Sequence, residues 1–492
     1  MGKAAGTVYN TAVQASLPLI SEQGKLQSQV SSLQTLQSDL TTLQTAIQSL
    51  GSQSTWNSVT ASSSNTNAAT ISASSGAPQT SVSFTVNQLA QGQISTLSGL
   101  TATNATNPAS TSNGTLTITG GLGNANVSIS SGDSLNTIAS NINNDASTTG
   151  VQASVIPVNV SGSTQYELML SSTQIGATKG AFTINSSQGF ALTSVQPAQD
   201  ANLTLGTGSS GVMITSATNT FTNALPNTSI TAVSTGTGTI SIQSDPQAVT
   251  KAMKALMDAY NSVESQVYSG GGASDTTIGQ LIAGQLPSAI NTSVSTDTMF
   301  TSLSQVGALL SPGSYAISNG SFSSTAAPSL GWQSAGGVSG VSLPSGVTFQ
   351  DGSTTFTNAV QSNRADLQNF LGVTSSGLKL PSGSFLGQLS AQVKLWQQDL
   401  SGATVNGTTV TGEISQLQNQ IGTSGSTAAP GSVNYSLNQL EQQYTSQVQS
   451  LVSQWSAAQA SIMLASSQMT SLQAMQSLTS SSYYQLGTML GG

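Results

Sequence analysis

The sequence contains neither cysteine nor histidine. Without cysteine the chain can form no disulfide bond and no thiolate metal site. Without histidine it lacks the most common general base and a frequent metal ligand. Its 16 aspartates and glutamates are scattered, and they form no linear calcium-binding loop. We therefore predict no catalytic residue, no cofactor and no metal site. Two distant carboxylates that meet in a cleft, as in a glycosidase, are the remaining enzymatic alternative.

Charge is also scarce: charged residues make up 5% of the 492-residue chain, against about 25% in an average protein. Eight basic residues are too few to hold a phosphate backbone, so we predict no nucleic-acid partner. No apolar run reaches the roughly 18 residues that a membrane span requires. Pro18 interrupts the apolar run at residues 17–20, so we expect no cleaved signal peptide.

The first 51 residues carry a regular apolar repeat. Two sets of apolar side chains recur every seven residues, and the sets are offset by three, which places them on one side of a helix. The members of this N-terminal seam are Leu26, Leu33, Leu36, Leu40, Leu43, Ile47 and Leu50. The residues between them are mostly Gln, Ser and Thr, and Gly51 is expected to end the helix.

The last sixty residues repeat this pattern and contain no proline from Ser432 onward. The members of the C-terminal seam are Val448, Leu451, Trp455, Ile462, Met469 and Leu472. So narrow an apolar seam needs a partner helix, and we predict that the two seams pair as a coiled coil. The alternative is that each is an ordinary amphipathic helix packed on a globular core. Trp455 is expected to pack in the seam rather than to bind a ligand.

The middle of the chain predicts β-structure, followed by helices. Alternating apolar residues indicate strands at residues 151–160 and 166–171, with a turn between them. Asp133 is expected to cap a short helix that precedes these strands. Residues 52–79 are interpreted as a linker with at most one strand. At Asp245-Pro246 a helix is expected to begin, and Asn319-Gly320 predicts a hairpin turn. Residues 327–346 are expected to form a loop.

We therefore predict an α+β fold with paired terminal helices. The expected domains are a coiled-coil helix at 1–51, a linker with one strand at 52–79, a β-rich domain at 80–244, a helical domain with a β-hairpin at 245–400, and a coiled-coil segment at 401–492. The β-rich domain is expected to divide into an outer part at 96–199 and an inner part formed by 80–95 and 200–244.

The order of these elements resembles the flagellar filament-capping proteins, the flagellar hook-associated protein 2 family. Leu17-Pro18-Leu19 before the heptads resembles the family's first helix. The run Val-Asn-Gln-Leu-Ala-Gln at 86–91 and the run Tyr-Glu-Leu-Met-Leu-Ser at 166–171 resemble its head strands. The run Asp-Ala-Tyr-Asn at 258–261 resembles the return from head to leg. The chain departs from the family in its low charge and in lacking the usual Ser-Gly-Leu-Asp opening.

The resemblance implies a structural protein outside the cell, at the tip of a flagellum. It implies a ring-like homo-oligomer, commonly a pentamer, whose legs contact flagellin and other hook-associated proteins. It also implies an export chaperone and export by the flagellar type III route. The alternative is another flagellar axial protein or a fibre-like structural adhesin. The low charge suggests a surface adapted to acid, although secreted appendage proteins are often poor in charge.

Overall fold

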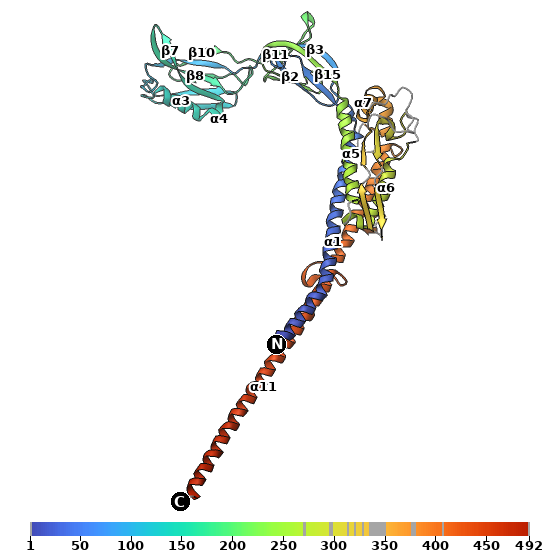
Figure 1. Cartoon of the computed structure of the whole chain (residues 1–492). Helices are drawn as coiled ribbons and strands as arrows, with labels where there is room; N and C mark the ends of the chain where they lie inside the picture. Colours follow the sequence, from blue (N-terminus) through green and yellow to red (C-terminus); the bar gives the residue numbers. More distant parts are fainter. Residues whose placement is uncertain are drawn as a thin grey trace. The chain divides into compact units, whose positions relative to one another are not determined.

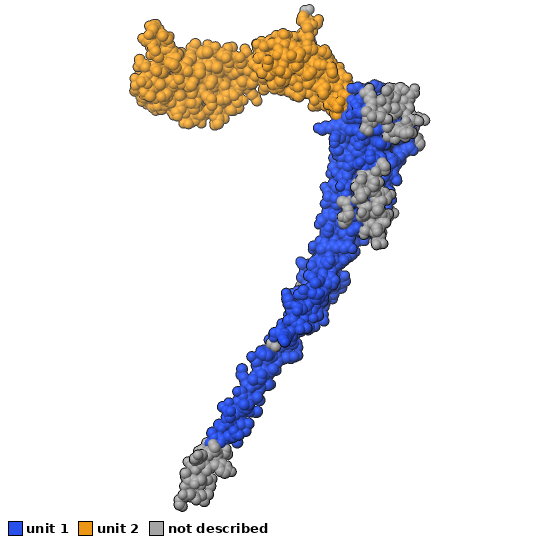
Figure 2. Space-filling model, viewed as in Figure 1, with its two compact units in different colours: residues 1–52, 250–492 blue, residues 53–249 orange. Residues whose placement is uncertain are grey.

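The computed structural model describes residues 2–268, 272–294, 299–311, 314–318, 321–326, 329–333, 351–374, 380–405 and 408–490. The chain forms two compact units, which Figure 2 shows in different colours. Residues 53–249 form the β unit, and residues 1–52 together with 250–492 form the helical unit. Figure 1 traces the chain through both.

The β unit contains two hydrophobic clusters, and the first joins two antiparallel sheets. The first sheet has the order β1 (Val59–Ser63), β15 (Gly236–Ser244), β3 (Thr80–Gln88), β11 (Ala201–Leu205) and β12 (Val212–Ser216). The second has the order β13 (Thr220–Thr222), β14 (Thr228–Ala232) and β2 (Ala69–Ala73). Side chains such as Phe84, Leu203 and Ile230 fill the space between them. A short helix, α2 (Gln53–Trp56), and a 3₁₀ turn, η1 (Gly208–Ser210), complete this part.

Residues 53–79 differ from the predicted linker with at most one strand. β1 pairs with β15 and β2 pairs with β14, so this segment supplies a strand to each sheet. Its buried side chains include Ala68 and Ala69, each 1% exposed. Small buried residues leave only a weak apolar pattern in the sequence, which is why the second strand escaped prediction.

The second cluster lies among two further antiparallel sheets and one helix. One sheet has the order β10 (Ala191–Gln196), β4 (Ile94–Ala102), β8 (Ser163–Ser172) and β7 (Val151–Val160), and the other has the order β6 (Gly123–Ile129), β5 (Gly114–Gly120) and β9 (Thr183–Ser186). The predicted hairpin of β7 and β8 is confirmed. Its turn residues Ser161 and Gly162 have φ angles of 51° and 87°, as a type I′ turn requires.

The helices of this second part are α3 (Leu135–Asn144) and α4 (Ala146–Thr149). The hydroxyl of Ser134 accepts the N-terminal hydrogen bond of α3, from the amide of Thr137. The predicted cap, Asp133, instead accepts a hydrogen bond from the backbone of Ser130. That prediction was wrong by one residue, because both neighbours carry a capping side chain.

The helical unit contains the remaining elements. Its helices are α1 (Gly2–Leu50), α5 (Pro246–Tyr268), α6 (Thr277–Ile290), α7 (Gly352–Ser362), α8 (Arg364–Leu371), α9 (Phe385–Ser401), α10 (Glu413–Ile421) and α11 (Val433–Leu490). Its strand pairs are β16 (Ala308–Ser311) with β19 (Ser329–Trp332), β17 (Ser314–Ser318) with β18 (Ser321–Ala326), and β20 (Gly402–Val405) with β21 (Thr408–Thr411). Short 3₁₀ turns are η2 (Gly272–Asp275), η3 (Leu303–Val306) and η4 (Gly425–Thr427).

Local chemistry explains where the helices of this unit begin. Asp245 accepts a hydrogen bond from the amide of Gln247 at the start of α5, as predicted. At α6, the Glu413 carboxylate accepts hydrogen bonds from the amides of Thr277 (2.9 Å) and Ile278 (2.7 Å), which satisfies two free donors of the first turn. The predicted turn at 319–320 lies outside the described residues, and β19 occupies part of the segment predicted to be a loop.

Side-chain amides fasten a helix to a strand in each unit. In the helical unit, Asn261 of α5 accepts from the amide of Leu330 (2.7 Å) and donates to its carbonyl (2.9 Å). In the β unit, Asn143 of α3 makes the same pair of bonds with Ala153 of β7, at 2.8 and 3.0 Å. Each side-chain amide therefore forms, with one strand residue, the two hydrogen bonds that a neighbouring strand would otherwise form. The run at 258–261 that carried the family resemblance contains one of these two contacts.

Candidate functional site

The N-terminal seam is buried within the helical unit. Every one of its seven members is at most 4% exposed. This part of α1 packs on α9, α10 and η2. Polar contacts border the seam, where Gln44 donates to the Ser390 hydroxyl (3.0 Å) and Gln397 donates to the Thr41 hydroxyl (3.3 Å). The leucines therefore serve as the stripe of an amphipathic helix on a globular core, the alternative weighed in the sequence analysis.

Gly51 directly follows the last residue of α1 and lies close to two leucine side chains. A Cβ atom on Gly51 would lie 2.5 Å from Cδ2 of Leu380 and 3.5 Å from Cδ1 of Leu386. A side chain at position 51 would therefore require the end of the Leu380 side chain to move.

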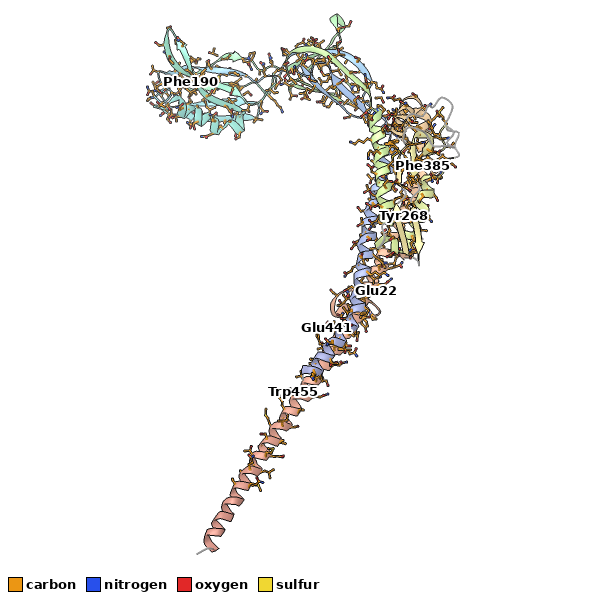
Figure 3. The ribbon with its side chains drawn as sticks, in the orientation of Figure 1. Glu22, Phe190, Tyr268, Phe385, Glu441 and Trp455 are labelled. Atoms are coloured by element: carbon orange, nitrogen blue, oxygen red, sulfur yellow. The ribbon has the colours of Figure 1, made fainter. Side chains whose placement is uncertain are left out.

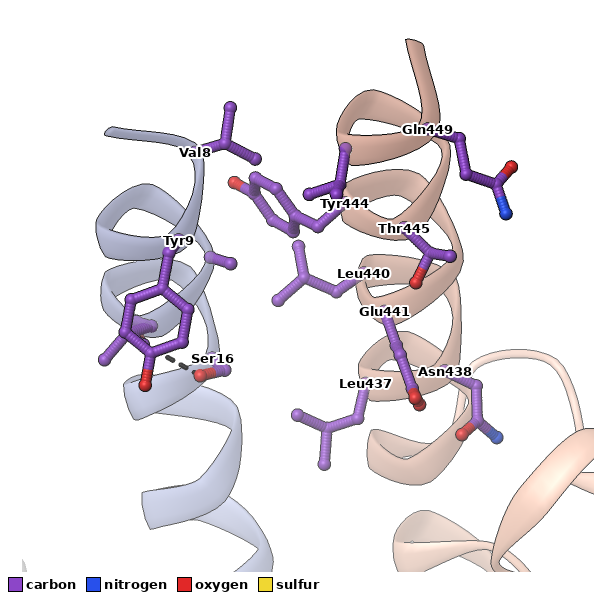
Figure 4. Close-up of a pocket in the computed structure, with 13 residues that line it drawn as sticks. Val8, Tyr9, Ser16, Leu437, Asn438, Leu440, Glu441, Tyr444, Thr445 and Gln449 are labelled. Carbon is purple, nitrogen blue, oxygen red and sulfur yellow. Dashed lines mark hydrogen bonds between the residues drawn. The ribbon is translucent and has the colours of Figure 1, made fainter. Parts of the chain in front are cut away.

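The terminal helices do pair, as predicted, but, apart from Val448, along residues that the heptad analysis did not include. The first turns of α1 and the first turns of α11 enclose an apolar groove of about 550 Å³. Its apolar lining comes from Val8, Tyr9, Ala12 and Val13 on α1 and from Leu437, Leu440, Tyr444 and Val448 on α11. Figure 4 shows Leu437, Leu440 and Tyr444 directed toward α1, whereas Asn438 and Gln449 point away from it.

These groove residues extend the two predicted seams by the same seven-residue spacing. Ala12 lies fourteen residues before Leu26, and Leu437 and Tyr444 lie fourteen and seven residues before Leu451. The signal was present but weak, because Glu22 and Gln29 interrupt the repeat in α1 and Glu441 interrupts it in α11. A polar contact between Gln23 and Asn434, at 2.6 Å, also joins the two helices.

The C-terminal seam lies mostly on the surface of α11. Val448 borders the groove and is 42% exposed, Trp455 is 43% exposed, and Leu451 is half-buried. Farther along, Ile462, Met469 and Leu472 are 59–67% exposed. Figure 3 places Trp455 on the part of α11 that runs beyond α1. Val448 therefore borders the groove beside α1, and Leu451 is partly covered. The remaining members, Trp455, Ile462, Met469 and Leu472, form an exposed apolar stripe, called here the α11 stripe.

The polar residues of α11 leave this helix suited to packing. Several of its hydroxyls donate to a carbonyl one turn earlier, including Ser453 to Gln449 and Ser461 to Ala457, both at 3.0 Å. These donors are already satisfied, so covering them with a partner would leave no unpaired group. Glu441 is the one charged residue between Val433 and Leu490. The chemistry of this surface is therefore apolar association rather than ion pairing.

Other kinds of site find no support in the described ranges. There, no three His, Cys, Asp or Glu side chains gather in a way that could hold a metal ion. None of the helices, over its described residues, combines the length and the apolarity of a bilayer span.

Comparison with known proteins places the chain. Residues 9–93 match the family model of the flagellar hook-associated protein 2 N-terminus, and residues 198–311 match that of its C-terminus. Residues 115–174 match the flagellin hook IN motif. No curated protein sequence matches the chain.

One solved structure shows the same fold over most of the chain, and two others match parts of it. The D1-D2-D3 domains of the flagellar cap protein FliD from Escherichia coli are 23% identical, with a TM-score of 0.51, and the match covers 78% of this chain and 98% of that one. The D2-D3 domains of the same protein are 28% identical, with a TM-score of 0.32, over 38% of this chain and 100% of that one. FliD (HAP2) from Pseudomonas aeruginosa PAO1 is 20% identical, with a TM-score of 0.32, over 40% and 93%.

The fold is that of a flagellar cap protein, and the predicted α+β class with paired terminal helices is confirmed. The models of both the N-terminus and the C-terminus of flagellar hook-associated protein 2 match this chain, and the chain belongs to that family.

Proposed function

We propose that the chain is a filament cap, an oligomeric scaffold at the flagellar tip that promotes folding and insertion of exported flagellin. Membership of the flagellar cap family supports this location outside the cell. The observation that carries the proposal is the α11 stripe, whose apolar side chains lie exposed in the single chain. We assign the protein a structural role with no catalytic step.

The α11 stripe favours assembly because an exposed helix of this composition gains little stability alone. Beyond α1, the helix is rich in Ser and Gln, and isolated helices are marginal in water. Packing the stripe against other helices would bury side chains as large as Trp455 and Ile462, each contributing roughly 1.5–3 kcal/mol when fully buried. Association is therefore the state in which this segment is stable.

We propose that the partners are further copies in a ring-like homo-oligomer, pentameric as is common in the family, together with flagellin and other hook-associated proteins. Before export, a chaperone would cover the same apolar stripe, since exposed patches of this kind promote aggregation. Export by the flagellar type III route, without a cleaved signal peptide, accords with a chain that contains no disulfide bond.

The test compares two double variants of α11. Trp455→Ser with Ile462→Ser removes two members of the stripe. Met463→Ser with Leu464→Ser removes two side chains that are 69% and 65% exposed but lie off the seven-residue repeat. The first variant should fail to form oligomers in sedimentation experiments and, in the native bacterium, should release unpolymerised flagellin into the medium.

The second variant should keep both oligomer size and filament growth, because it removes as much exposed apolar surface from a different face of the helix. Equal behaviour of the two variants would contradict an assembly role for the stripe. If the first variant formed normal oligomers but no longer supported filament growth, the stripe would be needed for flagellin insertion and not for self-association.

A further inference from the structure

One carboxylate lies in the interior of the helical unit. Glu264 of α5 is 0% exposed, and its Oε1 accepts a hydrogen bond of 2.5 Å from the hydroxyl of Tyr260, one helical turn earlier. Its second oxygen, Oε2, is also buried and has no hydrogen-bond partner in the described part of the chain. A buried carboxylate with a free oxygen is costly in the ionised form and far less so when protonated.

Among the described residues, the elements that form hydrogen bonds with α5 supply no ion-pair partner to this carboxylate. α5 bonds to α1 through Gln266 and Ser32, to α6 through Tyr268 and Ala283, to α7 through Thr250 and Thr357, and to β19 through Asn261. The described residues of α6, α7 and β19 carry no charged side chain.

The charged groups on the remaining faces lie elsewhere. Lys25 of α1 is exposed, and Asp39 of α1 is half-buried and acidic, so it offers no positive charge. On α5 itself, the Lys254 amine pairs with Asp258 at 2.7 Å on the exposed face. The group that favours the ionised form of Glu264 is the hydroxyl of Tyr260, through its hydrogen bond.

We propose that folding of the helical unit takes up a proton on Glu264, so that this unit is a proton-linked element that acid stabilises. Burial raises the pKa of Glu264 from 4.5 to about 7, and the Tyr260 hydrogen bond lowers it within that balance. Between these two pH values the folded chain holds a proton that the unfolded chain has lost. The resulting stabilisation is complete below pH 4.5 and disappears as the pH rises through 7.

The test measures unfolding of the full chain by denaturant, followed by helix circular dichroism, at pH 5 and pH 7.5. With these pKa values, the unfolding equilibrium constant should be about 60-fold larger at pH 7.5 than at pH 5. Glu264→Gln keeps the shape of the side chain but cannot ionise, so its unfolding constant should change only a few-fold across this range. A wild-type chain without the pH dependence would overturn the proposal.

Three further variants separate Glu264 from other carboxylates. Burial also raises the pKa of Asp39, so Asp39→Asn shows whether that residue contributes instead. Glu441→Gln, at an exposed position of the same unit, should keep the wild-type response. Tyr260→Phe removes the hydrogen bond that lowers the pKa of Glu264, so the pH at which stability is lost should move upward. If Asp39→Asn abolishes the effect and Glu264→Gln does not, the assignment is wrong.

Direct proton counting keeps the proposal testable even if Glu264→Gln fails to fold. Refolding of the wild-type chain at pH 6, in a weakly buffered solution with a pH indicator, should take up about 0.9 proton per chain at Glu264. Release of protons, or no net uptake, would overturn the proposal.

Discussion

The β unit and the helical unit bury different kinds of polar side chain. The buried polar residues of the β unit are hydroxyls: Ser95, Ser110, Thr149 and Thr228. Those of the helical unit include Glu264, a carboxylate. Hydroxyls keep the same hydrogen bonds at any ordinary pH, whereas a buried carboxyl group binds a proton. The comparison teaches that low overall charge does not make the stability of the whole chain independent of pH. A single buried carboxyl group can make the stability of the unit that contains it depend on pH.

The largest expected effect tests whether the two units are independent. Replacing Leu33 and Leu40 with Ser puts two hydroxyls into the contact of α1 with the other helices, at positions that are 0% exposed. Each loss of a buried leucine costs about 2–5 kcal/mol, so the helical unit should unfold while the β unit stays folded. Hydrogen exchange followed by mass spectrometry reports on both units in one sample.

Leu17→Ser is the matched control on the same helix, because Leu17 is 51% exposed and should tolerate the change. If the double variant also removed protection from the strands of the β unit, the two units would have to be treated as one cooperative structure.

A smaller effect compares the two amides that join a helix to a strand. Asn261→Ala should cost about 2 kcal/mol, because it leaves the amide and carbonyl of the buried Leu330 without their partner. Asn143→Ala should cost only about 1 kcal/mol, since Asn143 is exposed and water can replace it. Denaturant titrations measure both, with Asn136→Ala on the exposed face of α3 as control. Equal costs would show that solvent access does not decide the difference.

The smallest effect is expected for the β unit in acid. Residues 53–249 contain five carboxylates and Lys179, and none of these six side chains is buried. Protonating all five changes the net charge from −4 to +1, which is little for a unit of this size. A fragment of these residues should unfold cooperatively, with midpoints at pH 7 and pH 2.5 within a few degrees of each other. Unfolding of the fragment at pH 2.5 would show that the stability of the β unit also depends on pH, which would contradict the difference between the two units.

Much of the fold follows from local patterns in the sequence. The hairpin of β7 and β8 was predicted because large apolar residues alternate and a flexible turn joins them. The start of α5 was predicted by the capping signal at Asp245-Pro246. β2 was missed because alanine fills its buried positions, and the second strand of a segment cannot be inferred where small residues conceal its alternation.

The candidate site was harder to predict because a heptad repeat defines a face of a helix and not what covers it. The leucines of α1 and the α11 stripe have the same spacing, yet the first set is buried by α9 and α10 and the second is exposed. Glu264 was not singled out from the sequence, since nothing in its neighbouring sequence shows that α5 is covered on that side. Contacts between segments that are distant in the sequence determine which apolar stripe is buried and whether Glu264 is buried.

The two helix-to-strand amides also bear on how the protein ages. Asn143 precedes Asn144, and Asn261 precedes Ser262. Slow hydrolysis of either side-chain amide would replace its N–H donor with a negatively charged oxygen, directly opposite the carbonyl oxygen that now accepts its hydrogen bond. In the proposed role of filament cap, the protein stays outside the cell, where a damaged copy cannot be renewed in place. Its working lifetime would then depend on the chemical durability of two asparagines, one in each unit.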